Sequence, residues 1–111
     1  MLALVLIMTS TFAFAQTQTP YAKGKYYGEK TISTAAFSDN EEDGNKLIKS
    51  IENYILQNIE TGEQMLSFIE GYEAGVRKAC EYFDLGKEVA DAIIDEVINS
   101  IIEAAEAVAS L

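Results

Sequence analysis

Apolar residues recur every three or four positions through residues 41–111, and this period constrains the fold more than any other feature of the chain. The period is typical of amphipathic helices that bury one face. It predicts a first helix that Asp43 or Asn45 caps, that has Leu47 on its apolar face, and that ends near Asn58. Three such segments joined by short turns predict an all-α fold, a small bundle of three main helices.

The second and third helices have boundary signals of their own. Thr61 and Gln64 have the spacing of a capping box, which predicts that the second helix begins there. Residues 84–86, Asp-Leu-Gly, predict the turn into a third helix over residues 87–109. The apolar face of that helix is wider than two short neighbours need. It therefore predicts a homodimer interface in addition to the core of the monomer.

Two glycines, Gly71 and Gly75, lie four residues apart inside the second helix. A glycine inside a helix costs about 1 kcal/mol relative to alanine, so something must offset that cost. The simplest offset is a neighbouring backbone that packs close against both glycines. Such spacing also occurs in membrane helix pairs, but the adjacent charges Glu70, Glu73 and Arg77 exclude a membrane location.

The first forty residues divide into two expected segments. Residues 1–15 are an apolar run that ends in Ala-Phe-Ala, which is typical of a secretory signal peptide and its cleavage site. This run is shorter than the about 20 apolar residues that a membrane span needs. Residues 16–40 are rich in Thr, Ser, Gly and Lys without a helical period, which predicts an irregular, flexible N-terminal arm. We therefore expect a periplasmic or secreted protein with no membrane span.

The composition argues against an enzyme. The chain has no His and a single cysteine, Cys80, so the usual general base and the usual zinc ligand are both missing. Cys80 lies on the apolar side of the second helix, where a thiol is an inert small hydrophobe. A formal net charge of −10 opposes binding to nucleic acid. We expect no catalytic residues, no metal and no cofactor.

Two short patterns together resemble a known family. The first is Gly44-Asn45-x-Leu47, and the second is Gly71-Tyr72-x-x-Gly75-Val76-x-x-Ala79. Their order and spacing are similar to those of the Rap/Tai family of small exported helical proteins. Some members of that family are immunity proteins that protect bacteria from peptidoglycan amidases of type VI secretion. The resemblance covers about residues 43–102.

The resemblance implies a partner and a role for the motif residues. The partner would be a peptidoglycan hydrolase toxin, and the motif residues would set the fold rather than contact the toxin. Family members usually carry structural cysteines, which are absent here because Ile51 and Ile69 stand at those positions.

Acidic turns are the expected contact surface for a protein partner. Glu41, Glu42 and Asp43 precede or open the first helix, and Glu60 and Glu63 flank the turn into the second. Exposed acidic turns suit insertion into a cleft, and an acidic surface steers association with a basic partner. The alternative function is an exported structural or stress protein without catalytic activity that self-associates through the third helix.

Overall fold

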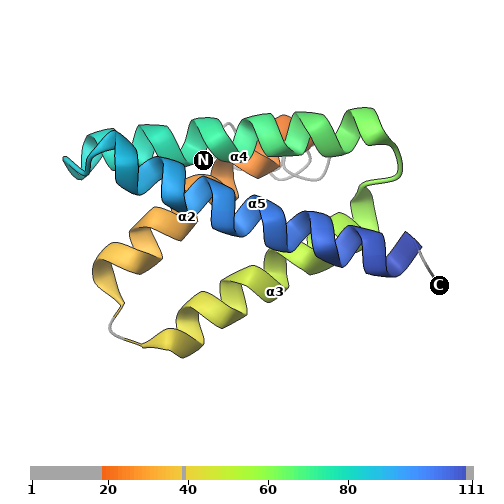
Figure 1. The fold of residues 1–111 in the computed structure, drawn as a ribbon, viewed down its shortest axis with the longest axis horizontal. Helices are drawn as coiled ribbons and strands as arrows, with labels where there is room; N and C mark the ends of the chain where they lie inside the picture. The colour runs from red at the N-terminus through yellow and green to blue at the C-terminus, as the bar shows by residue number, and fades with distance from the viewer. Residues whose placement is uncertain (1–18, 39, 110–111) are drawn as a thin grey trace, which may run out of the picture.

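The computed structural model describes residues 19–38 and 40–109, and it confirms an all-α fold. The helices of these described residues are α2 (Pro20–Phe37), α3 (Glu41–Asn58), α4 (Gly62–Tyr82) and α5 (Lys87–Ala109). Helix α5 contacts both α4 and α3, while α2 lies mainly against α4 (Figure 1). The described residues therefore form one helix more than the three that the sequence predicted. The expected signal peptide over residues 1–15 lies outside the described residues.

The extra helix is α2, where the sequence predicted an irregular arm. Its start has clear local causes: the Thr19 hydroxyl accepts a hydrogen bond from the Ala22 N–H at 3.1 Å, and Pro20 is the first helical residue. The buried positions of α2 are Gly24, Gly28 and Ile32, which are four residues apart. Because two of these three residues are glycines, the buried face has no run of apolar side chains, and its helical period is hidden.

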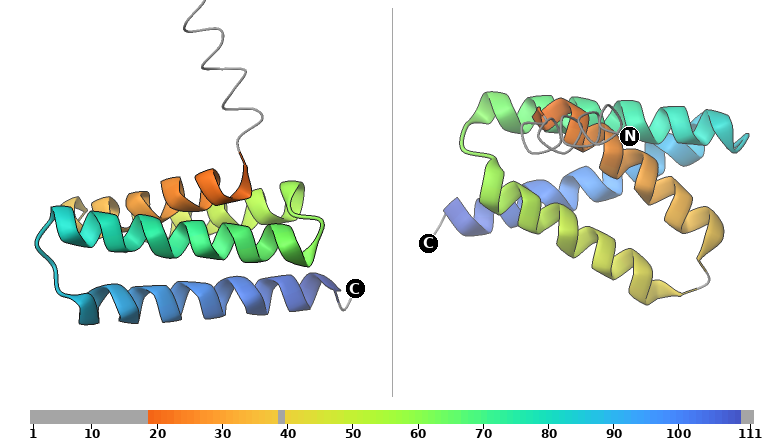
Figure 2. Two further views of the ribbon diagram at one scale, coloured as in Figure 1. Left: turned by 90° about the horizontal axis from the view of Figure 1, so that it is seen from above. Right: turned by 180° about the vertical axis from the view of Figure 1, so that it is seen from behind.

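Helix α2 packs against α4 through glycines of both helices (Figure 2). This is the close backbone contact that the sequence predicted at Gly71 and Gly75. A Cβ added at Gly24 would overlap the carbonyl oxygen of Phe68, and one at Gly71 would overlap that of Tyr21. Gly28 and Gly75 are placed in the same way against the opposite backbone. We call this four-glycine contact the glycine seam. It brings two helix backbones into direct contact, which offsets the helical cost of the glycines.

A single hydrophobic core joins all four helices. Its largest fully buried side chains are Tyr72, Phe68, Ile32, Ile51 and Val76. The hydroxyl of Tyr72 donates a hydrogen bond of 2.9 Å to the Thr31 hydroxyl across the seam. The buried phenol therefore has a partner, which avoids the cost of a buried unsatisfied polar group.

Helix α3 is held to this core by few side chains. Ile51 and Ile55 are its buried residues. Its cap is Asn40, whose side-chain oxygen accepts a hydrogen bond of 2.8 Å from the Glu42 N–H, and not Asp43 or Asn45 as predicted. The helix begins earlier than expected because three acids fit in its first turn, where the helix dipole favours negative charge.

The remaining boundaries follow the sequence. Thr61 and Gln64 form the predicted capping box, and α5 covers the predicted range. Helix α4 ends at a turn in which the Leu85 N–H donates a hydrogen bond of 2.7 Å to the Cys80 carbonyl. Asp84 lies in this turn with φ at 58°, a left-handed conformation that usually belongs to glycine.

The monomer core buries most of the apolar stripe of α5. Ala90, Ile94, Val97 and Ile101 are buried, whereas Val89 and Ile102 are the substantially exposed large apolar side chains among those described in α5. The wide apolar face that predicted a homodimer is thus largely used within one chain. Over the described residues, no helix is both long enough and apolar enough to cross a membrane.

Candidate partner-binding site

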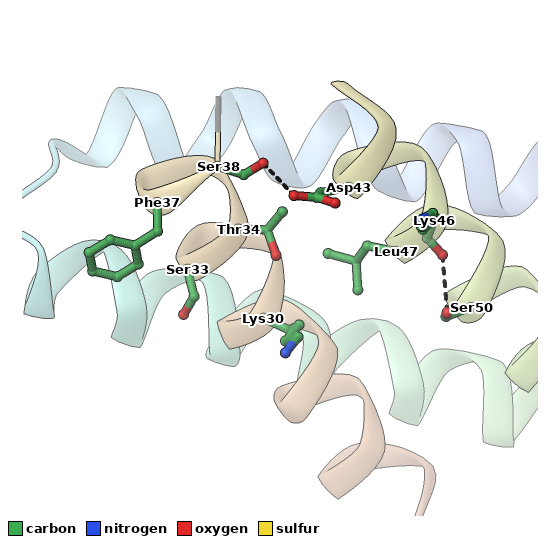
Figure 3. A pocket seen from close by; sticks show the side chains of 9 residues that line it. All are labelled: Lys30, Ser33, Thr34, Phe37, Ser38, Asp43, Lys46, Leu47 and Ser50. Carbon is green, nitrogen blue, oxygen red and sulfur yellow. Dashed lines mark hydrogen bonds between the residues drawn. The ribbon is translucent and has the colours of Figure 1, made fainter. Parts of the chain in front are cut away.

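An open groove lies between α2 and α3, near the turn that joins them (Figure 3). Its volume is ≈ 530 Å³, which is within the range of about 300–1,000 Å³ typical of ligand pockets. Its lining comprises two lysines, one aspartate, four hydroxyl residues and two apolar side chains: Lys30, Lys46, Asp43, Ser33, Thr34, Ser38, Ser50, Phe37 and Leu47. We call it the α2–α3 groove.

The groove is more cationic than the rest of this acidic chain. Lys30 and Lys46 both line it and are both exposed. Asp43, the one carboxylate among the described lining residues, accepts a hydrogen bond of 2.7 Å from the Ser38 hydroxyl. Within the described part of the chain, neither lysine lies within ion-pair distance of a carboxylate. Two ammonium groups are thus available to a ligand.

A cluster of exposed aromatic rings adjoins the groove. Phe37 is 79% exposed and Tyr82 is 82% exposed, although both are large aromatic side chains. Both rings contact Phe83, with centroid distances of 5.5 Å and 5.1 Å and nearly perpendicular planes. We call Phe37, Tyr82 and Phe83 the aromatic end. It combines residues from the ends of α2 and α4 and is not visible in either helix alone.

The acidic residues expected to contact a partner are exposed but lie in two separate places. Glu41, Glu42 and Asp43 form the first turn of α3. Glu60 and Glu63 lie at its other end, around the turn into α4. Since α3 has 18 residues and a helix rises 1.5 Å per residue, about 27 Å separates the two groups. One narrow cleft therefore cannot receive both, and only the first group adjoins the α2–α3 groove.

The five motif residues in α4 all have structural positions. Gly71 and Gly75 form part of the glycine seam. Tyr72 and Val76 are fully buried, and Ala79 is 7% exposed. These residues pack the interior and are not accessible to a partner.

The motif residues at the start of α3 differ from those in α4. A Cβ added at Gly44 would meet no described atom within 4 Å, and Asn45 is exposed. Only Leu47 of this group packs against the core. The fold-setting role expected for Gly44 and Asn45 therefore has no basis in their packing. Of the two positions where family members carry cysteines, Ile51 is buried and Ile69 is half-buried.

Cys80 has the surroundings of a structural residue. Its side chain is 2% exposed, and burial raises the pKa of its thiol, although the nearby Arg77 acts in the opposite direction. Arg77 itself pairs with Asp91 at 2.9 Å. No group of three or more potential metal ligands occurs among residues 19–38 and 40–109.

Lys30 of α2 lines the groove, whereas Lys23 of the same helix makes cation–π contacts. Lys23 lies over the rings of Tyr26, Tyr27 and Tyr54, with its ammonium 5.2–5.8 Å from the ring centroids. Burial raises the pKa of Tyr27, with smaller contributions from its two tyrosine neighbours. The cation–π contact between Lys23 and Tyr54 helps to hold α2 to α3.

Sequence reasoning missed both the aromatic end and the groove that brings Lys30 and Lys46 together. The spacing Gly24-x-x-x-Gly28 repeats that of Gly71 and Gly75, and it was the available signal that residues 16–40 contain a helix.

Comparison with family models, with curated proteins and with solved structures finds no match for this chain.

Proposed function

We propose that this protein is an exported binding protein without catalytic activity, which acts by binding and inhibiting a protein partner. The observation that carries this proposal is the aromatic end. Tyrosine and phenylalanine are enriched at the centres of protein interfaces, where their burial contributes much of the binding energy. Two such rings, Phe37 and Tyr82, are about four-fifths exposed, and a partner that covers them gains substantial apolar burial.

The finer proposal is an immunity protein that inhibits a peptidoglycan amidase toxin of type VI secretion. Its support is the family resemblance of the two motifs together with the expected signal peptide over residues 1–15. An inhibitor of this kind needs a stable body and an exposed contact face. The buried motif residues of α4 suit the first need, and the aromatic end suits the second.

A capture experiment with matched variants tests this proposal. The full chain is expressed with an affinity tag, purified from the cell envelope, and used to capture partners that are identified by mass spectrometry. We expect a stoichiometric peptidoglycan amidase whose activity the protein inhibits. Phe37→Ser and Tyr82→Ser should abolish capture, while Leu66→Ser should not, because Leu66 is 58% exposed in the first half of α4 and lies outside the aromatic end. Equal capture by all three variants would exclude the aromatic end as the contact.

Self-association is the second candidate function. It is favoured by the exposure of Val89 and Ile102 on α5, which are 42% and 39% exposed. Sedimentation equilibrium distinguishes it from the first candidate. An oligomer that Val89→Ser and Ile102→Ser dissociate, in a preparation that captures no other protein, would favour a self-associating structural or stress protein.

A further inference from the structure

We propose that the α2–α3 groove binds an acidic peptide segment, one that carries an apolar side chain between its carboxylates. The inference rests on the proposed function, because the segment would belong to the protein partner. The groove shares only Phe37 with the aromatic end and offers a different chemistry, so variants of its lysines test it separately.

The charge distribution is the first argument. The chain has 18 acidic residues and 8 basic ones, and among the described residues only two of the basic side chains pair with a carboxylate. Lys30 and Lys46 are distinguished by their place in one groove. Arg77 pairs with Asp91, and Lys78 pairs with Glu29 at 3.4 Å. By contrast, Lys30 and Lys46 line one groove, as Figure 3 shows, and neither has an ion-pair partner among the described residues.

The state of the groove's own carboxylate is the second argument. Asp43 could neutralise one of these lysines, but its Oδ2 atom accepts the hydrogen bond from Ser38 instead. That bond fixes the carboxylate at the turn between α2 and α3. The two ammonium groups therefore remain available to carboxylates from outside the chain, and the described lining has two positive side chains against one negative one.

The apolar and hydroxyl groups are the third argument. The ring of Phe37 projects away from Leu47 at the end of α2, and Leu47 points from α3 towards Thr34 of α2 (Figure 3). These side chains provide an apolar surface between the charges. The hydroxyl of the half-buried Thr34 has no hydrogen-bond partner within the described chain, so it can bond the backbone of a bound peptide. An anion without an apolar part would leave this surface uncovered.

A pair of short peptides provides the test. The probe is Ac-Glu-Leu-Phe-Glu-amide, and its control is the uncharged Ac-Gln-Leu-Phe-Gln-amide. Binding to the full chain is measured by isothermal calorimetry and by NMR chemical-shift changes. Lys30→Gln and Lys46→Gln remove the proposed contacts. Lys49→Gln is the matched control, because Lys49 is an exposed lysine of the same helix as Lys46 and does not line the groove.

We expect the acidic peptide to bind more tightly than its control and to shift signals of Thr34 and Leu47. Exposed ion pairs are individually weak, so each groove variant should lose affinity by about two- to fivefold and the double variant by about four- to 25-fold. Affinity should also fall as salt is raised from about 0.05 to 0.5 M. Lys49→Gln should change little.

Several results would overturn the inference. Equal binding of the two peptides would mean apolar docking alone, and equal losses in all three lysine variants would mean a general charge effect. The absence of binding at millimolar peptide would exclude the site. Capture of a partner that the Lys30→Gln/Lys46→Gln variant retains would leave the proposed function intact and remove only this inference. Peptide binding without any captured partner would leave the groove's preference for acidic peptides intact and count against the proposed function.

Discussion

Substitution of Gly75 by alanine tests the glycine seam directly. The added Cβ would overlap the carbonyl oxygen of Lys25 and would lie 2.9 Å from its carbonyl carbon and 3.0 Å from the Glu29 nitrogen. All three atoms belong to the backbone of α2, so no side chain can rotate away. Because ordinary Cβ contacts begin near 3.4 Å, the two helices must separate by about 1 Å.

The size of the effect follows from two opposing terms. A gap of about 1 Å forfeits a quarter to a half of the dispersion energy of the atoms that face it, and overpacking of a core costs about 1–3 kcal/mol or more. Alanine regains about 1 kcal/mol through its higher helix propensity. Since α2 and α4 have the most extensive contact of any helix pair in the described residues, we expect a cost at the upper end of that range and a net loss of about 1–2 kcal/mol for Gly75→Ala.

Thermal unfolding followed by circular dichroism measures this loss, with Gly44→Ala as the control. At about 4–8 °C per kcal/mol, Gly75→Ala should lower Tm by about 4–16 °C. Gly44→Ala should raise Tm by several degrees, because a Cβ there meets nothing within 4 Å and gains the propensity of alanine without a clash. Gly75→Leu should prevent folding. A Tm for Gly75→Ala at or above that of the wild type would refute the close backbone contact.

The remaining predictions concern single buried or strained residues. Cys80→Ala should cost about 1–2 kcal/mol in urea unfolding and leave partner binding intact. Native Cys80 should resist thiol reagents because burial raises the pKa of its thiol. Rapid labelling of Cys80 in the folded protein would contradict this. Asp84→Gly should raise stability by about 0.5–1 kcal/mol, since glycine adopts a φ of 58° without strain, and an unchanged Tm would count against strain at this turn. Burial raises the pKa of Tyr72 to about 12 from 10.0, an effect that its hydrogen bond with Thr31 partly opposes. The contribution of Tyr72 to stability should therefore be constant below pH 10 and fall by about 2–3 kcal/mol between pH 10 and 12, where the unfolded chain loses the phenolic proton and the folded chain keeps it. Urea titrations of Tyr72→Phe should show a smaller decline over that range, and an equal decline would remove Tyr72 as its cause.

The aromatic end and the groove show why the site was harder to predict than the helices. Phe37 is separated from Tyr82 and Phe83 by more than forty positions in the chain. Nothing local distinguishes an exposed phenylalanine from a buried one, and the sequence analysis assigned Phe37 to a flexible arm. Lys30 and Lys46 likewise come from two helices, so their shared groove exists only once α2 and α3 meet.

Helix α2 marks the limit of reasoning from apolar periodicity. A periodic pattern reports side chains that bury hydrocarbon, and at Gly24 and Gly28 the buried group is backbone. Propensity also disfavours a helix with two glycines in its interior. The helix forms because α4 presents its own glycines at the same spacing, which is a property of the pair and not of either segment.

By itself, the sequence determined the class of the fold and the positions of three of its helices. Side chains within one turn of each other provide those signals, such as the capping box of Thr61 and Gln64 and the apolar stripes of α3, α4 and α5. The tertiary structure alone decided that residues 20–37 are helical and that Ala90, Ile94, Val97 and Ile101 of α5 are buried in the monomer core. It also decided that two lysines and three aromatic rings gather near the α2–α3 turn. Those outcomes depend on which backbones and surfaces meet across the fold, and such contacts join residues that are far apart in the chain.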